Sequence, residues 1–198
     1  FPEVNLEGIS GATFGFRNEG WMDPMSLLNG FRRKARQLGA HYVHDEVVDL
    51  LGGRTKIEGV RLKSGSDVKA QTVINAAGAR ASTIAAMAQV QIPIGPQRLV
   101  TFVFDCQRGV DHSALTQDVS GVILRPEGNS YLSGLAPGPD ENPWSFDCDI
   151  DYSVFEEQIW PVLAHRIPAF EAIKLRNAWA GHLDYNHFDN NAILGSHP

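Results

Sequence analysis

The sequence predicts an α+β fold made of helices, a small β-meander and an antiparallel sheet. Two observations support this prediction. The first half of the 198 residues contains one amphipathic helical pattern followed by short β-type runs, and the second half is mainly β-type runs separated by Gly, Pro and Asn turns. With 43% hydrophobic and 20% charged residues, the chain has enough apolar material for a sizeable core.

The first element is a helix that follows the stretch "EGWMDP". Asp23 is placed to cap its N-terminus, Pro24 fits its first turn, and Gly39 ends the pattern. Apolar residues recur on one face at three- and four-residue spacing, namely Leu27, Leu28, Phe31, Ala35 and Leu38. We therefore expect an amphipathic helix whose basic residues point outward.

Short strands are expected next. Residues 41–43 have a β-type composition, and three further runs follow, "EVVDLL", "KIEGVRLK" and "DVKAQTVIN". Gly-rich and Ser-rich turns separate these runs, which predicts a small meander. The last run ends in a buried strand at Val73 and Ile74, which turns at an Ala-Ala-Gly corner into a helix that starts near Arg80.

The corner formed by Ala76, Ala77 and Gly78 is a candidate binding site. A strand that turns directly into a helix points free backbone N–H groups and the positive end of a helix dipole at one place, which suits a phosphate or a ribose oxygen. Small residues let a ligand approach the backbone closely. The alternative is a tight turn in which small residues only relieve crowding. No G-x-G-x-x-G motif occurs in the sequence, so a dinucleotide site would need further residues upstream.

The second half predicts antiparallel strands in "QRLVTFVFDC", "GVILRPEGNSYLSGLAP" and "AIKLRNAWAGHL". One helix interrupts them. Ser153 and Glu156 form a capping-box pattern, and Pro161 is expected to kink or split the helix. Its apolar face consists of Phe155, Ile159, Val162, Leu163 and Ile167. The change of character near residues 92–96 gives two predicted parts, 1–95 and 96–198.

Charge and composition exclude several function classes. The formal net charge of −6 disfavours a nucleic-acid partner, which would need a concentrated basic face. No apolar run of about 18 residues occurs, so no membrane span is expected. His182, Asp184, His187 and Asp189 do not match the spacing of a metal site, so no metal is expected there.

Several separated motifs carry a resemblance along essentially the whole chain. In order, "EGWMDP", "VINAAGARA", "PIGPQR", "ILRPEG" and "WAGHLDYNHFDNNAILG" resemble the D-amino-acid oxidase and sarcosine oxidase superfamily of FAD-dependent amine oxidoreductases. "FPEVNLEGI" and "IPAFE" add a closer similarity to the FAD-dependent oxidoreductase domain-containing proteins, a branch that includes a mitochondrial respiratory complex I assembly factor. The resemblance implies that the chain is a central fragment of a longer flavoprotein.

The resemblance also implies what the two parts do. Residues 1–95 would be part of an FAD-binding, Rossmann-like domain, and residues 96–198 an antiparallel substrate domain with a flanking helix, truncated before the C-terminal flavin-binding segment. FAD is the implied cofactor of the full-length protein. Val47 would contact the adenine through its backbone, and the corner from Ala76 to Gly78 would lie against the ribose and pyrophosphate.

The implied activity is oxidation of the C–N bond of a small amine or N-methyl amino acid by the parent protein, whereas the isolated fragment is expected to be inactive. Tyr185 or His182 could orient the amine or take a proton near the flavin. The alternative for Tyr185 is a packed ring with a satisfied hydroxyl.

One departure from the family pattern keeps a second function open. Glycine oxidase-like members carry "WAGLRP", whose Arg binds the substrate carboxylate, whereas this chain reads Gly181-His182-Leu183-Asp184. The chain could therefore come from a catalytically degenerate member that acts as a binding or assembly platform for a protein partner. A cytoplasmic location is expected, with the mitochondrial matrix as the alternative.

Overall fold

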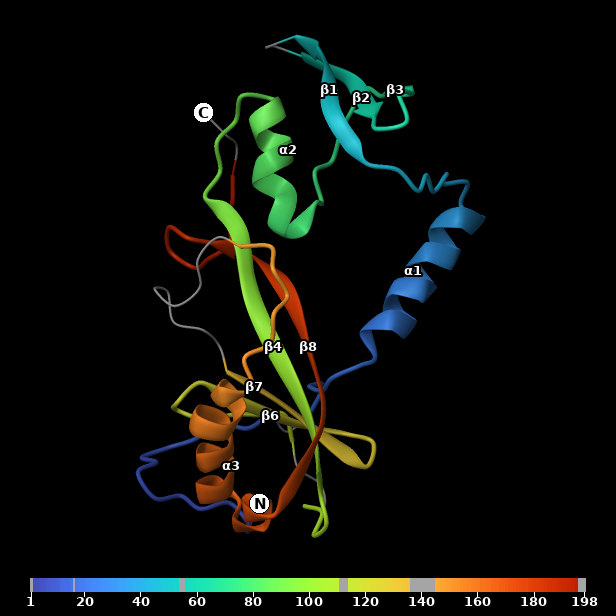
Figure 1. The fold of residues 1–198 in the computed structure, drawn as a ribbon. Coiled ribbons are helices and arrows are strands. Elements are labelled where there is room, and N and C mark those ends of the chain that lie inside the picture. The colour runs from blue at the N-terminus through green and yellow to red at the C-terminus, as the bar shows by residue number, and fades with distance from the viewer. Residues whose placement is uncertain (1, 16, 54–55, 111–113, 136–144, 196–198) are drawn as a thin grey trace. The chain divides into compact units, whose positions relative to one another are not determined.

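The structure combines helices with antiparallel strands, which confirms the predicted α+β class (Figure 1). It is a computed structural model. The residues it describes are 2–15, 17–53, 56–110, 114–135 and 145–195.

The chain divides into two compact units, each discontinuous in sequence. Unit 1 contains Phe1–Trp21 and Arg98–His182, and unit 2 contains Met22–Gln97 and Leu183–Pro198. Compact packing does not by itself assign a functional role. The FAD-binding role expected for residues 1–95 and the substrate-binding role expected for residues 96–198 therefore stay predictions.

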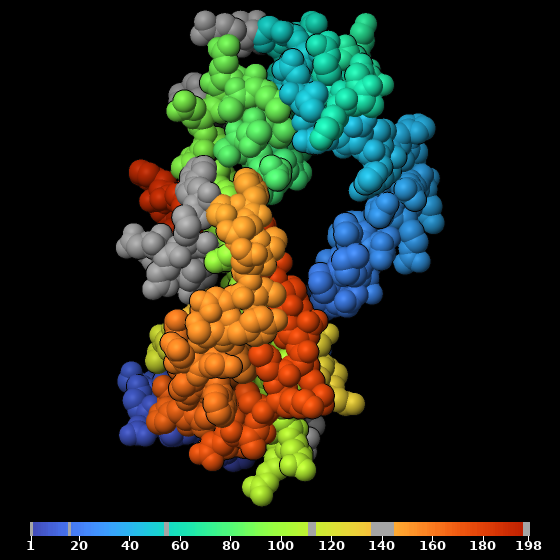
Figure 2. All heavy atoms as spheres, viewed as in Figure 1, coloured from blue at the N-terminus to red at the C-terminus, as the bar shows by residue number. Residues whose placement is uncertain are grey.

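Helix α1 (Pro24–Gln37) is the first helix of unit 2. The Asp23 carboxylate caps it by accepting a hydrogen bond from the backbone N–H of Ser26 at 2.6 Å. Gly39 follows the helix with φ of +92°, a conformation that glycine adopts without steric cost. The predicted caps are confirmed. None of the residues of α1 is buried, however, and the helix stands at the surface along its length (Figure 2).

The meander of unit 2 is confirmed as a three-stranded antiparallel sheet. Its strands are β1 (Val47–Gly53), β2 (Lys56–Leu62) and β3 (Asp67–Lys69), in that order. A short 3₁₀ helix (Gly78–Arg80) and helix α2 (Ala81–Met87) follow, so the predicted helix start near Arg80 is also confirmed.

Two predicted strands are wrong. Residues 41–43 and 73–74 are irregular, and Ile74 is 85% exposed instead of buried. A strand forms only where a neighbouring strand accepts and donates its backbone hydrogen bonds. Within the part of the chain that the structure describes, neither segment has such a neighbour, and β-type composition is not sufficient without one.

A five-stranded sheet carries the predicted β-rich second half. Its strands are hydrogen-bonded in the order β5-β6-β7-β4-β8, and the β5-β6, β6-β7 and β7-β4 pairs are antiparallel. The strands are β4 (Ile94–Cys106), β5 (Thr116–Gln117), β6 (Val122–Glu127), β7 (Ser130–Leu135) and β8 (Ile173–Asn186).

The predicted helix of unit 1 changes its geometry beside Pro161. A π-helical segment (Phe155–Ile159) passes directly into α3 (Trp160–Arg166), and a 3₁₀ turn (Pro168–Glu171) follows. Proline has no N–H for an intrahelical bond, which accounts for the change of helix type at this point.

The predicted capping box at the start of this helix is wrong. The Ser153 hydroxyl does not cap a later N–H and instead donates a hydrogen bond to Asp151 Oδ1 at 2.7 Å. The same carboxylate oxygen accepts the backbone N–H of Ser153 at 2.9 Å. Asp151 therefore takes the hydroxyl that a capping box would use, because a carboxylate two residues earlier closes a tighter local turn.

The core of unit 1 lies between the helix and one face of the sheet (Figure 1). The ring of Phe104 from β4 lies 5.2 Å from that of Phe170 and 5.4 Å from that of Tyr131. The predicted apolar face of the helix is confirmed, because four of its members are buried in this cluster and Val162 is partly buried against it.

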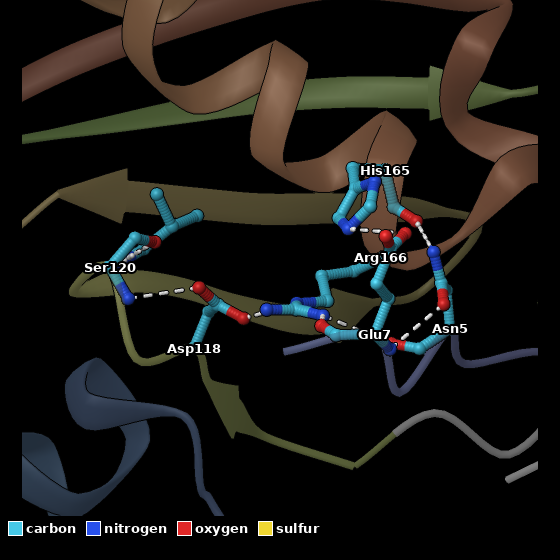
Figure 3. A network of polar contacts seen from close by, with 7 residues as sticks. Asn5, Glu7, Asp118, Ser120, His165 and Arg166 are labelled. Atoms are coloured by element: carbon cyan, nitrogen blue, oxygen red, sulfur yellow. Dashed lines mark hydrogen bonds and ion pairs between the residues drawn. The ribbon is translucent and has the colours of Figure 1, made fainter. Parts of the chain in front are cut away.

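A partly buried ion pair ties the N-terminal segment to this core (Figure 3). Arg166 at the end of α3 donates from Nε to Asp118 Oδ2 at 2.6 Å, and from Nη1 to the carbonyl oxygens of Asn5 and Glu7 at 3.2 and 2.6 Å. The backbone N–H of Asn5 donates in return to the Arg166 carbonyl at 2.7 Å. One guanidinium thus joins three segments that lie far apart in sequence.

Candidate functional site

The predicted cofactor corner is a rigid turn held by Asn75. The Asn75 side chain accepts a hydrogen bond from the N–H of Ala77 at 3.2 Å and donates one to the carbonyl of Ala81 at 2.8 Å. It therefore brackets the corner from both sides. Asn75 was not among the predicted site residues, although an Asn two residues before a turn is a known signal for such a bracket.

Gly78 is the position where the corner needs glycine. Its φ is +56°, in the left-handed region, and a Cβ placed there would meet nothing within 4 Å. The N–H groups of Gly78 and Ala79 open the helical run and have no acceptor within it. Ala76 and Ala77 are exposed. The corner is thus open on the side of Gly78, as a group that approaches the backbone closely requires.

Val47, the other predicted cofactor residue, lies in the same unit as the corner. It is the first residue of β1 and pairs with Leu62. Helix α2, which follows the corner, packs against β1. Glu46, the residue before Val47, senses the charge at the corner. Its hydrogen bond with Lys63 lowers the pKa of its carboxyl group most, and the positive charge of Arg80 at the corner lowers it further. The structure therefore brings all four predicted cofactor residues into unit 2.

His182 lies in a different setting, in unit 1. Its Nε2 donates to the carbonyl of Asp147 at 3.0 Å, and its ring centroid lies 5.5 Å from that of Phe146. Because Nε2 is used as a donor, Nδ1 is the acceptor of the neutral ring. The Asp147 carboxylate forms an ion pair with Arg98 on β4. The hydrogen bond from Ser145, helped by Arg98, holds the pKa of Asp147 below its usual value.

Tyr185 lies near the end of β8, in unit 2. Its ring centroid is 5.1 Å from that of His187. It lines a cavity of about 500 Å³ together with isoleucine and asparagine residues. His182 and Tyr185 are only three residues apart, but the contacts found for them are with different segments. A joint role for His182 and Tyr185 therefore stays a prediction. The residue pattern contained no signal that could have predicted the cavity or the ion pair between Arg98 and Asp147.

Two features are absent from the residues that the structure describes. No helix among them is long and apolar enough to cross a membrane. No group of three His, Cys, Asp or Glu side chains in the same residues is arranged to hold a metal ion.

The profile of a family described as DAO, FAD dependent oxidoreductase, matches residues 1–198. The chain belongs to this family. FAD is therefore the cofactor that the family uses, as the sequence motifs predict.

The similar sequences include FAD-dependent oxidoreductase domain-containing proteins and sarcosine dehydrogenases. FAD-dependent oxidoreductase domain-containing protein 1 of Xenopus laevis is 35% identical over 230 residues, and the alignment covers 100% of this chain and 46% of that protein. The mitochondrial sarcosine dehydrogenase of Homo sapiens is 24% identical, with 100% of this chain and 23% of that protein covered. The chain spans about half the length of the FAD-dependent oxidoreductase domain-containing relatives it matches.

Two solved structures show that this chain shares a known fold. L-proline dehydrogenase from P. horikoshii superposes with a TM-score of 0.77 at 24% identity, covering 88% of this chain and 47% of that one. Glycine oxidase from Geobacillus kaustophilus gives a TM-score of 0.71 at 22% identity, covering 87% and 45%. At these identities the likeness establishes the fold.

Proposed function

We propose that the chain is part of an FAD-dependent oxidoreductase that oxidises the C–N bond of a small amine or N-methyl amino acid. The observation that carries the proposal is the corner at Ala76 to Gly78, which is open beside a glycine with positive φ and lies in one unit with Val47. Similarity to a sarcosine dehydrogenase, a glycine oxidase and an L-proline dehydrogenase supports an amine-bearing substrate.

The donor set at the corner fits the phosphate and ribose part of FAD. The N–H groups of Gly78 and Ala79 would donate to it, and the bracket by Asn75 keeps them in place. Val47 would hold the adenine through its backbone. FAD, when bound, would supply the acceptor for the hydride removed from the carbon beside the nitrogen.

The chain's own contribution to the chemistry would be orientation and proton transfer. His182 donates from Nε2 to Asp147, so its Nδ1 is the atom that could take a proton. Tyr185 could orient the amine through its hydroxyl. A change in the pH dependence of turnover in His182→Gln would test the proton-transfer role of His182.

Titration with FAD tests the proposal, using this chain and a longer version that continues beyond both of its ends. Visible absorption measures binding, and anaerobic bleaching of bound flavin by candidate amines measures turnover. We expect Gly78→Ala to weaken FAD binding about tenfold, because a methyl group would occupy the open side of the corner. Gly39→Ala is the matched control, because Gly39 also has positive φ and open space but lies at the end of α1.

Equal FAD affinity in both variants would contradict the proposed corner. Bound flavin that no amine bleaches would favour the second candidate function, a degenerate member that acts as an assembly platform. The observation that favours this candidate is the exposed apolar face of α1, which offers surface for a protein partner. The isolated chain is proposed to be inactive.

The cytoplasm is the proposed compartment, with the mitochondrial matrix as the alternative. The alternative draws support from the mitochondrial sarcosine dehydrogenase among the relatives. Fractionation of cells that express the full-length protein decides between them.

A further inference from the structure

The cavity beside Tyr185 is a candidate binding site to which no role has been given. It lies entirely in unit 2, between the start of β4 and the end of β8. Its volume of about 500 Å³ falls in the range that holds small ligands. The residues that matter for the argument are Ile92, Ile94, Asp184, Tyr185, Asn191 and Ile193. We call this cavity the Tyr185 pocket.

The rim of the Tyr185 pocket is held in shape by the turn that follows β8. Asn186 is buried, and its Nδ2 donates to Asp189 Oδ1 and to the carbonyl of Asn191, each at 2.7 Å. The N–H of His187 donates to the carbonyl of Pro93 at 2.9 Å, which fastens the turn to the segment before β4. A pocket with a fixed rim loses less conformational entropy when a ligand binds.

The charge of the Tyr185 pocket selects the kind of ligand. Among the residues that line it, Asp184 is the one with a full charge, and the other polar groups are a phenol and amides. Asp184 forms no ion pair with any residue whose position is described. A carboxylate that lines a pocket and has no ion-pair partner among the described residues attracts a cation and disfavours an anion. The three isoleucine side chains offer contact to an alkyl group.

We propose that the Tyr185 pocket binds a small aliphatic amine in its protonated form and without a carboxylate group. The Asp184 carboxylate accepts the hydrogen bonds of the ammonium group, and the isoleucine side chains cover its alkyl part. The inference rests on the proposed function, because it narrows the amine substrate to one that carries no acid. Binding to the pocket itself requires no flavin.

The test uses three probes of the same shape on the 198-residue chain: isobutylammonium, isobutyrate and isobutanol. Methyl NMR of isoleucine follows binding at Ile92, Ile94 and Ile193. We expect isobutylammonium to shift these methyl signals and to bind at least tenfold more tightly than isobutyrate or isobutanol. Equal affinity for the amine and the alcohol, or shifts confined to other isoleucines, would overturn the proposal.

A charge-removing variant gives the second measurement. Asp184→Asn should weaken isobutylammonium binding about tenfold, because it removes the charge and keeps the shape. Asp49→Asn is the matched control, because Asp49 is an exposed aspartate of the same unit outside the pocket. Unchanged binding in Asp184→Asn contradicts the proposal, and the dispersion of the methyl signals shows whether each variant is folded.

The outcome separates this inference from the proposed function. Amine binding in the Tyr185 pocket, with no flavin bleaching by amines in the longer protein, upholds the pocket and contradicts the oxidoreductase proposal. Bleaching by N-methyl amino acids, with no amine bound in the pocket, upholds the oxidoreductase proposal and contradicts the proposed amine site in the pocket.

Discussion

Arg166 shows how much of unit 1 depends on single residues. The side chains of Arg166 and Asp118 are only 16% and 11% exposed, so their ion pair is largely withdrawn from water. The same guanidinium holds two carbonyl groups of the N-terminal segment. An ion pair of this kind stabilises the fold little more than apolar residues of the same size would. Removing one partner, however, destabilises the fold, because the other charge is left unpaired and largely withdrawn from water.

Removing this guanidinium should therefore destabilise unit 1 strongly. We expect Arg166→Met to lower the free energy of unfolding by about 3 kcal/mol. Arg176→Met is the control, because the ion pair of Arg176 with Asp105 is exposed to water and its loss should lower the stability far less. Urea denaturation measures both. Similar losses in the two variants would mean that burial of the Arg166 pair is unimportant.

Asp118 adds a pH dependence to the same pair. Burial would raise the pKa of its carboxyl group, but hydrogen bonds from Ser120 and Arg166 outweigh this and hold it below its ordinary value of 3.8. A lowered pKa in the folded state stabilises the fold above the ordinary value, and this stabilisation is lost as the pH falls through the folded-state pKa.

Unfolding followed from pH 7 down to about pH 2 should show this loss of stability below about pH 4. Asp118→Asn should be less stable at neutral pH and should have a smaller decrease in acid. An acid decrease of the same size in Asp118→Asn would show that other carboxyl groups cause it.

At the same scale, the sequence indicates candidate site residues but not their surroundings. His182 and Tyr185 were chosen because imidazole and phenol move protons, and that choice needed no structure. Their neighbours, Asp147 for one and His187 for the other, depend on which segments fold beside β8. Asn75 could have been found from its spacing to Ala77, whereas the ion pair of Arg98 with a residue 49 positions away could not.

At the scale of elements, the meander depends on one close approach. Gly59 in β2 lies opposite Lys69 in β3, and a Cβ at Gly59 would come within 2.2 Å of the Val68 carbonyl oxygen. The two strands pair at this distance because the position has no side chain.

Gly59→Ala should therefore separate β3 from β2. We expect faster amide hydrogen exchange in β3 and a loss of about 2 kcal/mol of stability in unit 2. Gly53→Ala, in β1, is the control, since a Cβ there would meet nothing within 4 Å. Equal exchange in both variants would contradict the role of the close approach.

Local signals decided which elements could be predicted. Helix α1 carries its start and stop in its own sequence, Asp23 and Gly39, and both work as expected. Strands carry no such signal, because their partners lie elsewhere in the chain. Residues 73–74 therefore have strand composition without a strand, and the proposed FAD corner begins from an irregular segment. The helix start that follows the corner was correctly predicted, whereas binding of a ligand at the corner stays a prediction.

At the scale of the whole molecule, apolar residues are divided unequally. Phe104 is fully buried in the core of unit 1, whereas Phe31 on α1 is 68% exposed. Sequence periodicity predicted an apolar face on α1 and another on the helix that contains Phe155 and Leu163. It could not tell which of the two faces is covered, because coverage depends on elements far away in the chain.

This difference predicts unequal costs of truncation. Phe104→Ala should lower the stability of unit 1 by about 4 kcal/mol, since it opens a cavity among packed rings. Phe31→Ala should change stability by less than about 0.5 kcal/mol in this chain. Thermal or urea unfolding measures both. A large loss in Phe31→Ala would show that α1 is covered, and would remove the support that its exposed face gives to the platform function.

The contact between Asn5 and Arg166 also sets the order in which the protein can be made. During synthesis the segment around Asn5 is translated 161 residues before the arginine that receives it. Unit 1 can close only after Arg166 has been synthesised, whereas the local contacts of α1 and the meander are available earlier. The segment around Asn5 must therefore wait without this partner while the residues up to Arg166 are translated, so we expect unit 1 to close after the meander has formed.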